Sequence, residues 1–257
     1  MNAPRPCVAR WAAVLLWAAV PAVQAAGPVP DLREAARANA QLGIAYLQQG
    51  QLALAKEKLE RAIQQDPESA EVRTSLAFLY ERLDMITEAD TEYRRAMRMS
   101  RNKSEVVNTY AVFLCRTGKP DAALKHFDAA ARDKLYTTPW AALANAGVCL
   151  RTAGRGPKAV PYLQRAVQLR PDYAPAVFEL AELQLELGSP GVAGLVVDRY
   201  LQLGLATPEI LLVGLRAALG REEREAAMVY ARRLQREFPD APETGQLPQV
   251  LDGGAAP

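Results

Sequence analysis

The chain has few side chains that could do chemistry. His126 is its only histidine, so the sequence excludes a multi-histidine metal site, and Ser/His or Cys/His catalysis would depend on this one imidazole. No nucleophile can be named beside it, which favours a surface or half-buried structural histidine. Cys115 and Cys149 are candidates for a disulfide. We therefore expect no enzymatic activity, no cofactor and no metal site.

Two further patterns resemble active-site motifs without matching them. The segment Gly154–Lys158 is rich in glycine and basic residues, but it lacks the spacing of a phosphate-binding loop and follows a helical pattern rather than a strand. Glu179, Glu182 and Glu186 share one helix face by their spacing. Such a stripe is more often solvated or partner-facing than an acid–base pair.

The elements that hold these side chains belong to a repeating pattern. Its first copy reads Leu42-Gly43-x-x-Tyr46, followed by Ala55 and Leu59, which fits the tetratricopeptide motif of two packed helices. Six copies follow one another at steps of 34 residues, with one step of 36. The second helix of every copy keeps an alanine where the two helices approach closely: Ala55, Ala89, Ala123, Ala159, Ala193 and Ala227.

A turn with left-handed backbone is expected between the two helices of each copy. Glycine adopts this conformation without steric cost, and aspartate tolerates it. In the second copy the place is taken by Asp84. In the other copies we assign it to Gly50, Gly118, Gly154, Gly188 and Gly220.

The repeats predict an all-α fold, a tetratricopeptide (TPR) solenoid of about six helical hairpins in a right-handed superhelix. The solenoid spans residues 36–240. The tail 241–257 has no apolar period but three prolines and three glycines, so we predict that it is disordered. The predicted repeats cover residues 36–69, 70–103, 104–137, 140–173, 174–207 and 208–240.

The N-terminal residues fit a secretory signal peptide. A short basic region precedes an apolar run from Trp11 to Val20, and mostly small residues follow it. This run is about half of the roughly 20 residues that a membrane-spanning helix needs. We therefore predict a signal peptide over residues 1–25, cleaved near Ala25, and a periplasmic mature protein. No cysteine follows the apolar run, so the lipobox of a bacterial lipoprotein is missing.

The charge balance argues against nucleic-acid binding through a basic face. The sequence holds 31 lysines and arginines against 29 aspartates and glutamates. Arg5 and Arg10, in the predicted signal peptide, account for the difference. A neutral mature chain lacks the electrostatic footprint of a nucleic-acid-binding protein. We expect protein partners, no nucleic acid and no small-molecule substrate.

The first helices of the repeats are expected to line a concave groove that binds an extended or helical partner segment. Phe78 and Val112 would supply apolar contacts there. Arg82, Arg116 and Arg151 would form a positive stripe for acidic or carbonyl groups. By repeat phase, the predicted groove residues are Phe78, Glu81, Arg82, Asn108, Val112, Arg116, Val148, Arg151, Phe178 and Glu182.

Cys115 and Cys149 occupy nearly equivalent places in the first helices of repeats 3 and 4. These helices are expected to pack side by side, so the thiols could come within bridging range, and an exported protein would oxidise them. A Cys115–Cys149 bridge would remove unfolded-chain entropy worth on the order of 3 kcal/mol. The alternative is a pair of small core residues that stay reduced.

Three segments go beyond the general repeat pattern. They are Asn108-Thr109-Tyr110-Ala111-Val112-Phe113-Leu114-Cys115-Arg116-Thr117-Gly118, Asn145-Ala146-Gly147-Val148-Cys149 and Ala38-Asn39-x-Gln41-Leu42-Gly43-x-x-Tyr46-Leu47. Together they resemble the signature of the type IV pilus biogenesis and stability family called PilF or PilW, the tetratricopeptide-repeat pilotins. The resemblance covers roughly residues 34–205 and extends to the count of six repeats.

The resemblance implies a periplasm-facing, outer-membrane-associated scaffold whose partner is the secretin ring of the pilus machine. Family members help the secretin to localise or multimerise, or stabilise pili. They are usually lipoproteins, so outer-membrane association of this chain would need another attachment. The alternative function is a periplasmic TPR adaptor that tethers or regulates an envelope enzyme, for example one acting on peptidoglycan. A third interpretation, that the chain is itself an enzyme, needs titratable groups clustered in a pocket.

Overall fold

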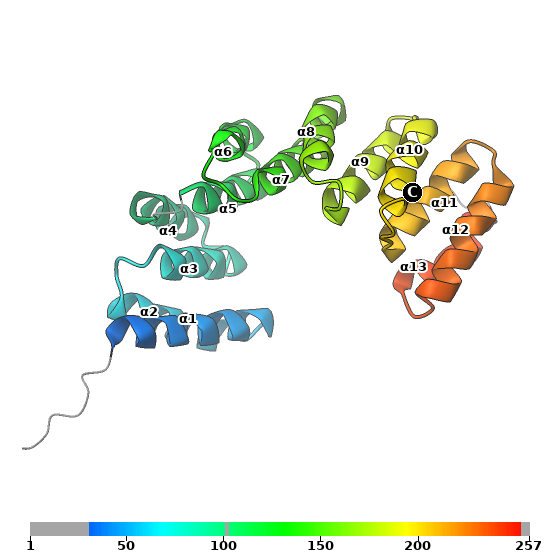
Figure 1. Cartoon of the computed structure of the whole chain (residues 1–257). Coiled ribbons are helices and arrows are strands. Elements are labelled where there is room, and N and C mark those ends of the chain that lie inside the picture. Colours follow the sequence, from blue (N-terminus) through cyan, green and yellow to red (C-terminus); the bar gives the residue numbers. More distant parts are fainter. Residues whose placement is uncertain (1–30, 101–102, 253–257) are drawn as a thin grey trace, which may run out of the picture. The chain divides into compact units, whose positions relative to one another are not determined.

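The computed structural model describes residues 31–100 and 103–252, and the described residues from Leu32 onward form one compact unit. In the described part every element of regular secondary structure is a helix, which confirms the predicted fold class (Figure 1). The predicted signal peptide lies outside the described residues. The helices are α1 (Leu32–Gln48), α2 (Leu52–Gln65), α3 (Ala70–Arg82), α4 (Ile86–Met99), α5 (Lys103–Arg116), α6 (Pro120–Arg132), α7 (Pro139–Thr152), α8 (Gly156–Leu169), α9 (Ala174–Glu186), α10 (Pro190–Leu201), α11 (Pro208–Gly220), α12 (Arg224–Glu237), α13 (Pro242–Gly245) and α14 (Leu247–Leu251).

The helices α1 to α12 form six hairpins, each with an odd-numbered first helix and an even-numbered second helix (Figure 1). In five hairpins the left-handed turn residue is the predicted one, for example Gly50 at φ 73° and Asp84 at φ 58°. The prediction of Gly220 for the sixth turn is wrong. Gly220 ends α11, and Glu222 has φ 61° instead. The reason is the register, because Glu222 lies one 34-residue step after Gly188.

The small residues of the pattern lie where the two helices of a hairpin touch. All six repeat alanines of the second helices are 0% exposed. In the first helices, Gly147 shows how close the approach is, since a Cβ there would lie 2.4 Å from Cγ of Leu163. The steric explanation of the pattern therefore holds in three dimensions.

The core continues from one hairpin into the next. Tyr93 of α4, Phe113 of α5, Phe127 of α6 and Cys149 of α7 belong to one buried cluster. The ring centroids of Tyr93 and Phe113 are 5.1 Å apart. Each hairpin thus buries its apolar faces against its neighbours, as expected for a repeat protein.

The prediction of a disordered tail from residue 241 is wrong for the described part of the tail. Residues 242–245 and 247–251 form the short helices α13 and α14. Leu247 is 2% exposed and packs into the same apolar cluster as Leu215 and Leu234. Val250 and Leu251 pack against the same cluster. The last hairpin has no following repeat, so these few apolar residues cover its open face and order the segment. The sequence shows no period there because so few apolar residues are needed.

Candidate protein-binding groove

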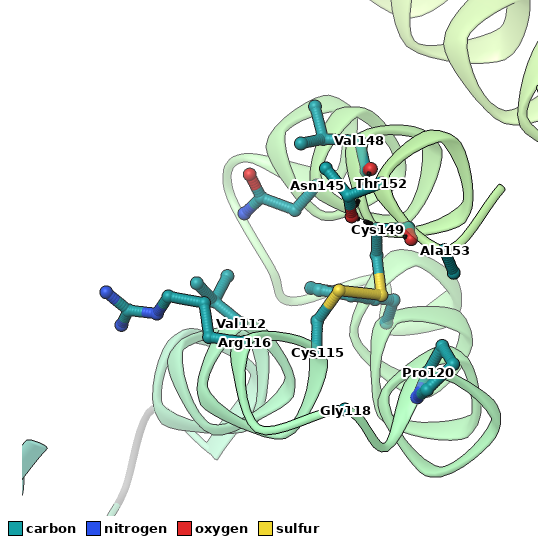
Figure 2. A pocket seen from close by; sticks show the side chains of 11 residues that line it. Val112, Cys115, Arg116, Gly118, Pro120, Asn145, Val148, Cys149, Thr152 and Ala153 are labelled. Atoms are coloured by element: carbon teal, nitrogen blue, oxygen red, sulfur yellow. Dashed lines mark hydrogen bonds between the residues drawn. A yellow bond between two sulfur atoms is a disulfide. The ribbon is translucent and has the colours of Figure 1, made fainter. Parts of the chain in front are cut away.

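Val112, Arg116 and Val148, three of the predicted groove residues, line one cavity of about 510 Å³ between α5 and α7. Asn145 joins them on the α7 side (Figure 2). Val112 and Val148 are half-buried, so part of each apolar side chain faces the cavity. We call this cavity, defined by Val112, Arg116, Asn145 and Val148, the α5–α7 groove.

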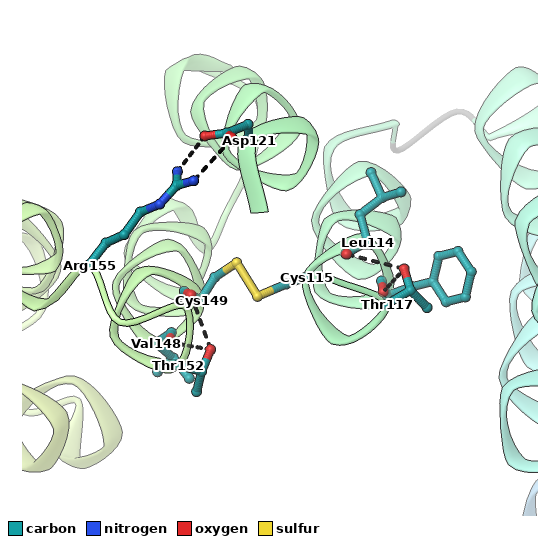
Figure 3. The surroundings of a disulfide bond; sticks show 9 residues. Leu114, Cys115, Thr117, Asp121, Val148, Cys149, Thr152 and Arg155 are labelled. Atoms are coloured by element: carbon teal, nitrogen blue, oxygen red, sulfur yellow. Dashed lines mark hydrogen bonds and ion pairs between the residues drawn. A yellow bond between two sulfur atoms is a disulfide. The ribbon is translucent and has the colours of Figure 1, made fainter. Parts of the chain in front are cut away.

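Cys115 and Cys149 lie between α5 and α7 next to the groove, with their Sγ atoms at bonding distance (Figure 3). Their Cα atoms are 5.7 Å apart, within the range that a disulfide requires. Close by, Arg155 Nη1 donates to Asp121 Oδ1 at 2.5 Å and so links repeats 3 and 4 a second time. The geometry permits the bridge, and oxidation of the two thiols in the cell stays a prediction.

Asn108 takes part in a contact between helices. Asn145 Nδ2 of α7 donates to Asn108 Oδ1 of α5 at 3.2 Å. Both side chains are half-buried beside the α5–α7 groove. The phase argument predicted Asn108, and it missed Asn145 as a lining residue although the resemblance had singled it out.

Arg116 forms an ion pair with an acidic residue of the preceding repeat, although half of its side chain is exposed. Its Nη2 lies 2.9 Å from Glu81 Oε2 on α3, and its guanidinium lies 5.8 Å from the ring centroid of Phe78. Glu81, whose side chain is 9% exposed, also accepts a hydrogen bond from the Tyr93 hydroxyl. Burial raises the pKa of Glu81, while Tyr93 and Arg116 act to lower it. Glu81 is therefore a partner for Tyr93 and Arg116 within the fold rather than an open contact point.

Arg151 is paired as well, across the next repeat boundary. Its Nη1 lies 2.5 Å from Glu179 Oε2, and its Nη2 lies 2.6 Å from Glu186 Oε1, both on α9. The hydrogen bond from Arg151 holds the pKa of Glu186 below its usual range. The predicted positive stripe is thus wrong for Arg116 and Arg151, because neighbouring first helices are near enough for acids one repeat away to neutralise them. Arg82 and Arg116 are both exposed, and of the three arginines only Arg82 forms no ion pair within the described chain.

The two predicted groove residues of repeat 5 lie away from the α5–α7 groove. The side chain of Glu182 is 11% exposed and pairs with Arg216 Nη1 of α11 at 2.6 Å. The prediction that Glu182 faces a partner from the groove is therefore wrong, because its carboxylate forms an ion pair between repeats 5 and 6. Phe178 packs partly into the core and borders a separate cavity of about 370 Å³ with Thr207 and Glu209.

His126 packs against an aromatic side chain of the same repeat. Its ring meets the Tyr110 ring edge-on, with centroids 5.2 Å apart. Burial, and secondarily the charge of Arg94, lowers the pKa of His126. Within residues 31–100 and 103–252, no three His, Cys, Asp or Glu side chains are grouped so that they could hold a metal ion. No helix of this part is long and apolar enough to cross a membrane.

Family models for the tetratricopeptide repeat match residues 43–84, 114–174 and 151–206. The chain belongs to the tetratricopeptide-repeat proteins. It is homologous to the type IV pilus assembly protein PilF of Pseudomonas aeruginosa, with 29% identity over 210 residues, which are 82% of this chain and 83% of PilF.

Solved TPR structures agree with this relationship. The crystal structure of PilW, a type IV pilus biogenesis factor, matches with a TM-score of 0.65 and 28% identity, over 82% of this chain and 97% of PilW. The structure of Pseudomonas aeruginosa PilF matches with a TM-score of 0.63 and 28% identity, over 85% of this chain and 99% of PilF. The predicted resemblance to PilF and PilW is confirmed, as homology to PilF and structural similarity to both.

Proposed function

We propose that this TPR protein is a non-enzymatic periplasmic scaffold for type IV pilus biogenesis. In this role it assists assembly or localisation of the outer-membrane secretin, or stabilises pili, through protein–protein contacts. The likeness to PilF and PilW supports the proposal, because it extends over 82% of this chain and 97% of PilW rather than over a few generic repeats. The predicted signal peptide supports the periplasmic location, with association to the outer membrane through partners.

The α5–α7 groove is the surface through which we expect the partner to bind. Val112 and Val148 offer half-buried apolar surface for a side chain of the partner. The hydrogen bond from Asn145 to Asn108 uses one donor and one acceptor. The remaining amide groups of both residues can therefore bind the backbone of an extended segment. This combination of apolar floor and paired amides is the observation that carries the assignment.

Capture of the secretin tests both the scaffold role and the groove. We expect the purified chain to capture the periplasmic part of the secretin from the same organism. Asn145→Ala combined with Val148→Ser should weaken capture about tenfold or more, as truncation of central interface residues does. Leu169→Ser on α8 is the control, because Leu169 is 49% exposed and lies outside the groove. Circular dichroism verifies that all variants are folded.

The outcomes test the groove assignment and the pilus role separately. If the folded double variant captures the secretin as well as the parent does, the groove assignment is wrong and another surface binds. If the parent protein captures no secretin, and deletion of its gene leaves piliation and twitching unchanged, the pilus role itself is wrong. Capture of a peptidoglycan-acting enzyme together with that result would favour the adaptor function.

A further inference from the structure

A second cavity, of about 440 Å³, lies between α6 and α8, the second helices of repeats 3 and 4. Arg132 borders it from α6 and Arg165 from α8, and both side chains are exposed. Its apolar part includes Ala131 and Leu143, which belong to the buried cluster beneath it. None of its lining residues borders the α5–α7 groove. We call this cavity the α6–α8 pocket.

The one carboxylate that lines the α6–α8 pocket, Asp128, has partners within the fold. It accepts a hydrogen bond from the Tyr162 hydroxyl at 3.2 Å, and its Oδ2 lies 3.2 Å from Arg132 Nη2. The Arg132 side chain is 78% exposed, so most of its five N–H donors stay open to a ligand. Arg165 forms no ion pair with another described residue. The pocket therefore has one positive charge in excess.

Among the five boundaries between successive repeats, only this one has an arginine at both places. Arg132 stands nine places after the buried alanine of its second helix, and Arg165 stands six places after that of the next. At the other boundaries the equivalent pairs are Gln64 with Arg95, Arg98 with Ala129, Gln168 with Arg199, and Gln202 with Arg233. Single unpaired cations occur on several second helices, but this combination does not recur.

Stacking of the repeats does not require the two arginines. The bond from Tyr162 to Asp128 recurs between α10 and α12, where the Tyr230 hydroxyl donates to Asp198 Oδ1 at 2.5 Å. That boundary has a glutamine in the place of Arg132. Its Arg233, in the place of Arg165, pairs with Glu237 at 2.9 Å. The tyrosine–aspartate pair is thus the shared packing device, and the open arginines are particular to the α6–α8 pocket.

The sequence around the α6–α8 pocket is rich in cations. Residues 134–171 include no aspartate or glutamate but six basic residues: Lys134, Arg151, Arg155, Lys158, Arg165 and Arg170. The acids nearest in sequence are all engaged. Asp121 pairs with Arg155, and Asp172 pairs with Arg170. Asp133 accepts hydrogen bonds from the Ser104 hydroxyl and from the backbone N–H of Leu135. An anion entering the pocket therefore meets no carboxylate without a partner.

We propose that the α6–α8 pocket binds an acidic protein segment, whose side-chain carboxylate lies between Arg132 and Arg165. Guanidinium groups match a carboxylate in charge and in planar donor geometry. Ala131 and Leu143 offer apolar surface to the aliphatic part of the segment. A recess between helices receives a protruding side chain, whereas a flat bilayer would contact residues that protrude from the protein. The observations therefore favour a protein segment over a lipid surface, and they are independent of the pilus role.

Fluorescence anisotropy with a labelled peptide of alternating glutamate and leucine tests the proposal on residues 26–257, which include the whole compact unit. We expect the peptide to bind, and to bind more weakly at high salt. A peptide with glutamine in place of glutamate should bind about tenfold more weakly or less, because its hydrogen bonds are not charge-assisted. Arg132→Gln combined with Arg165→Gln should weaken binding of the glutamate peptide to the same degree.

Asp128→Asn tests the sign of the charge that the pocket binds. It releases Arg132 from its ion pair, while the amide oxygen can still accept from Tyr162. The glutamate peptide should then bind more tightly, whereas a cationic ligand would bind more weakly. Arg199→Gln is the matched control, because Arg199 occupies the place of Arg165 one repeat later. It should bind the peptide as the parent does, and all variants should melt as the parent does.

The proposal is overturned if the parent does not bind the glutamate peptide, or if the double arginine variant binds it unchanged. It is also overturned if Arg199→Gln weakens binding as much as the double variant does, because the effect is then one of general charge. Vesicles of phosphatidylethanolamine with phosphatidylglycerol are the alternative probe. If they bind through Arg132 and Arg165 and the peptide does not, the anion comes from a lipid surface and the proposal is wrong. Secretin capture through the α5–α7 groove does not enter the test, because the two sites share no lining residue.

Discussion

Replacing Arg116 by methionine leaves a buried carboxylate without its cation. Glu81 keeps the hydrogen bond from the Tyr93 hydroxyl but loses the guanidinium of Arg116. Methionine retains an unbranched apolar stem that can still cover the Phe78 ring, so the substitution removes mainly charge. We expect the variant to fold and to be less stable than the parent at neutral pH.

The size of the loss follows from the unequal burial of the two partners. The Glu81 side chain is 9% exposed and that of Arg116 is 52% exposed. An exposed pair contributes about 0–1 kcal/mol, whereas removing one partner of a fully buried pair costs about 3–5 kcal/mol. Because only the carboxylate is buried here, we expect a loss of about 1–2 kcal/mol in the free energy of unfolding, between these limits. For a chain of this size that lowers the melting temperature by about 2–8 °C.

The loss should depend on pH with a defined sign. Burial raises the pKa of Glu81 above its usual value, and Arg116 acts against that rise. Without Arg116 the pKa of Glu81 rises further, so the folded variant binds a proton more tightly than its unfolded chain does. The free energy of unfolding of the variant then falls as the pH rises from the pKa of Glu81 in the unfolded chain to its higher pKa in the folded chain. The difference from the parent should shrink at acid pH, where the carboxyl group is neutral.

Thermal unfolding followed by circular dichroism between about pH 8 and about pH 4.5, around the ordinary titration range of glutamate, measures this difference. Arg82→Met is the control. Arg82 is exposed and unpaired within the described chain, so its loss should change stability by less than about 0.5 kcal/mol. A destabilisation by Arg116→Met that is equal at all pH values, or equal to that of Arg82→Met, would refute the reasoning.

Three further predictions concern the disulfide, the packing and export. Replacing Cys115 and Cys149 by serine should cost about 3–4 kcal/mol and lower the melting temperature by about 10 °C, and mass measurement should find no free thiol in the parent. Gly147→Ala places a Cβ 2.4 Å from a leucine carbon of α8 and should cost about 1–3 kcal/mol; Gly191→Ala, with open space, should be neutral or stabilising. N-terminal sequencing of exported protein should begin at or near Ala26.

The repeat architecture could be predicted from the sequence because it depends on the sizes of side chains at fixed spacing. Where a first helix crosses its second helix, only a residue such as Gly147 leaves room for Leu163. Gly43 and Gly214 are equally close to second-helix side chains, and Ala77, Ala111 and Ala181 take the equivalent place in repeats 2, 3 and 5. Because small residues recur at nearly constant spacing, several weak matches add to one strong inference. The turn at Glu222 shows the limit of matching residue types, because the position in the register decided the turn and the nearby Gly220 did not.

The charges of the groove could not be predicted in the same way. Phase arguments assign a residue to a helix face, but they do not say which side chain of the next repeat it meets. The pairs of Arg116 with Glu81, and of Arg151 with Glu179, cross repeat boundaries at separations of 35 and 28 residues. Which side chains meet across a repeat boundary depends on how one hairpin is offset against the next. That offset is fixed by packing over the whole interface between repeats.

The ion pairs of Arg151 with Glu179 and Glu186 make mutation of Arg151 a poor test of partner binding. Arg151→Glu would bring three carboxylates together, next to Glu179 and Glu186, whereas the side chain of Arg151 is now only 24% exposed. The loss of two ion pairs and the new repulsion would destabilise the boundary between repeats 4 and 5 by about 1–2 kcal/mol. A loss of partner binding in that variant would therefore reflect altered stacking of repeats as much as a lost contact. Recognition in the α5–α7 groove is better probed at Asn145 and Val148, because neither residue carries charge across a repeat boundary.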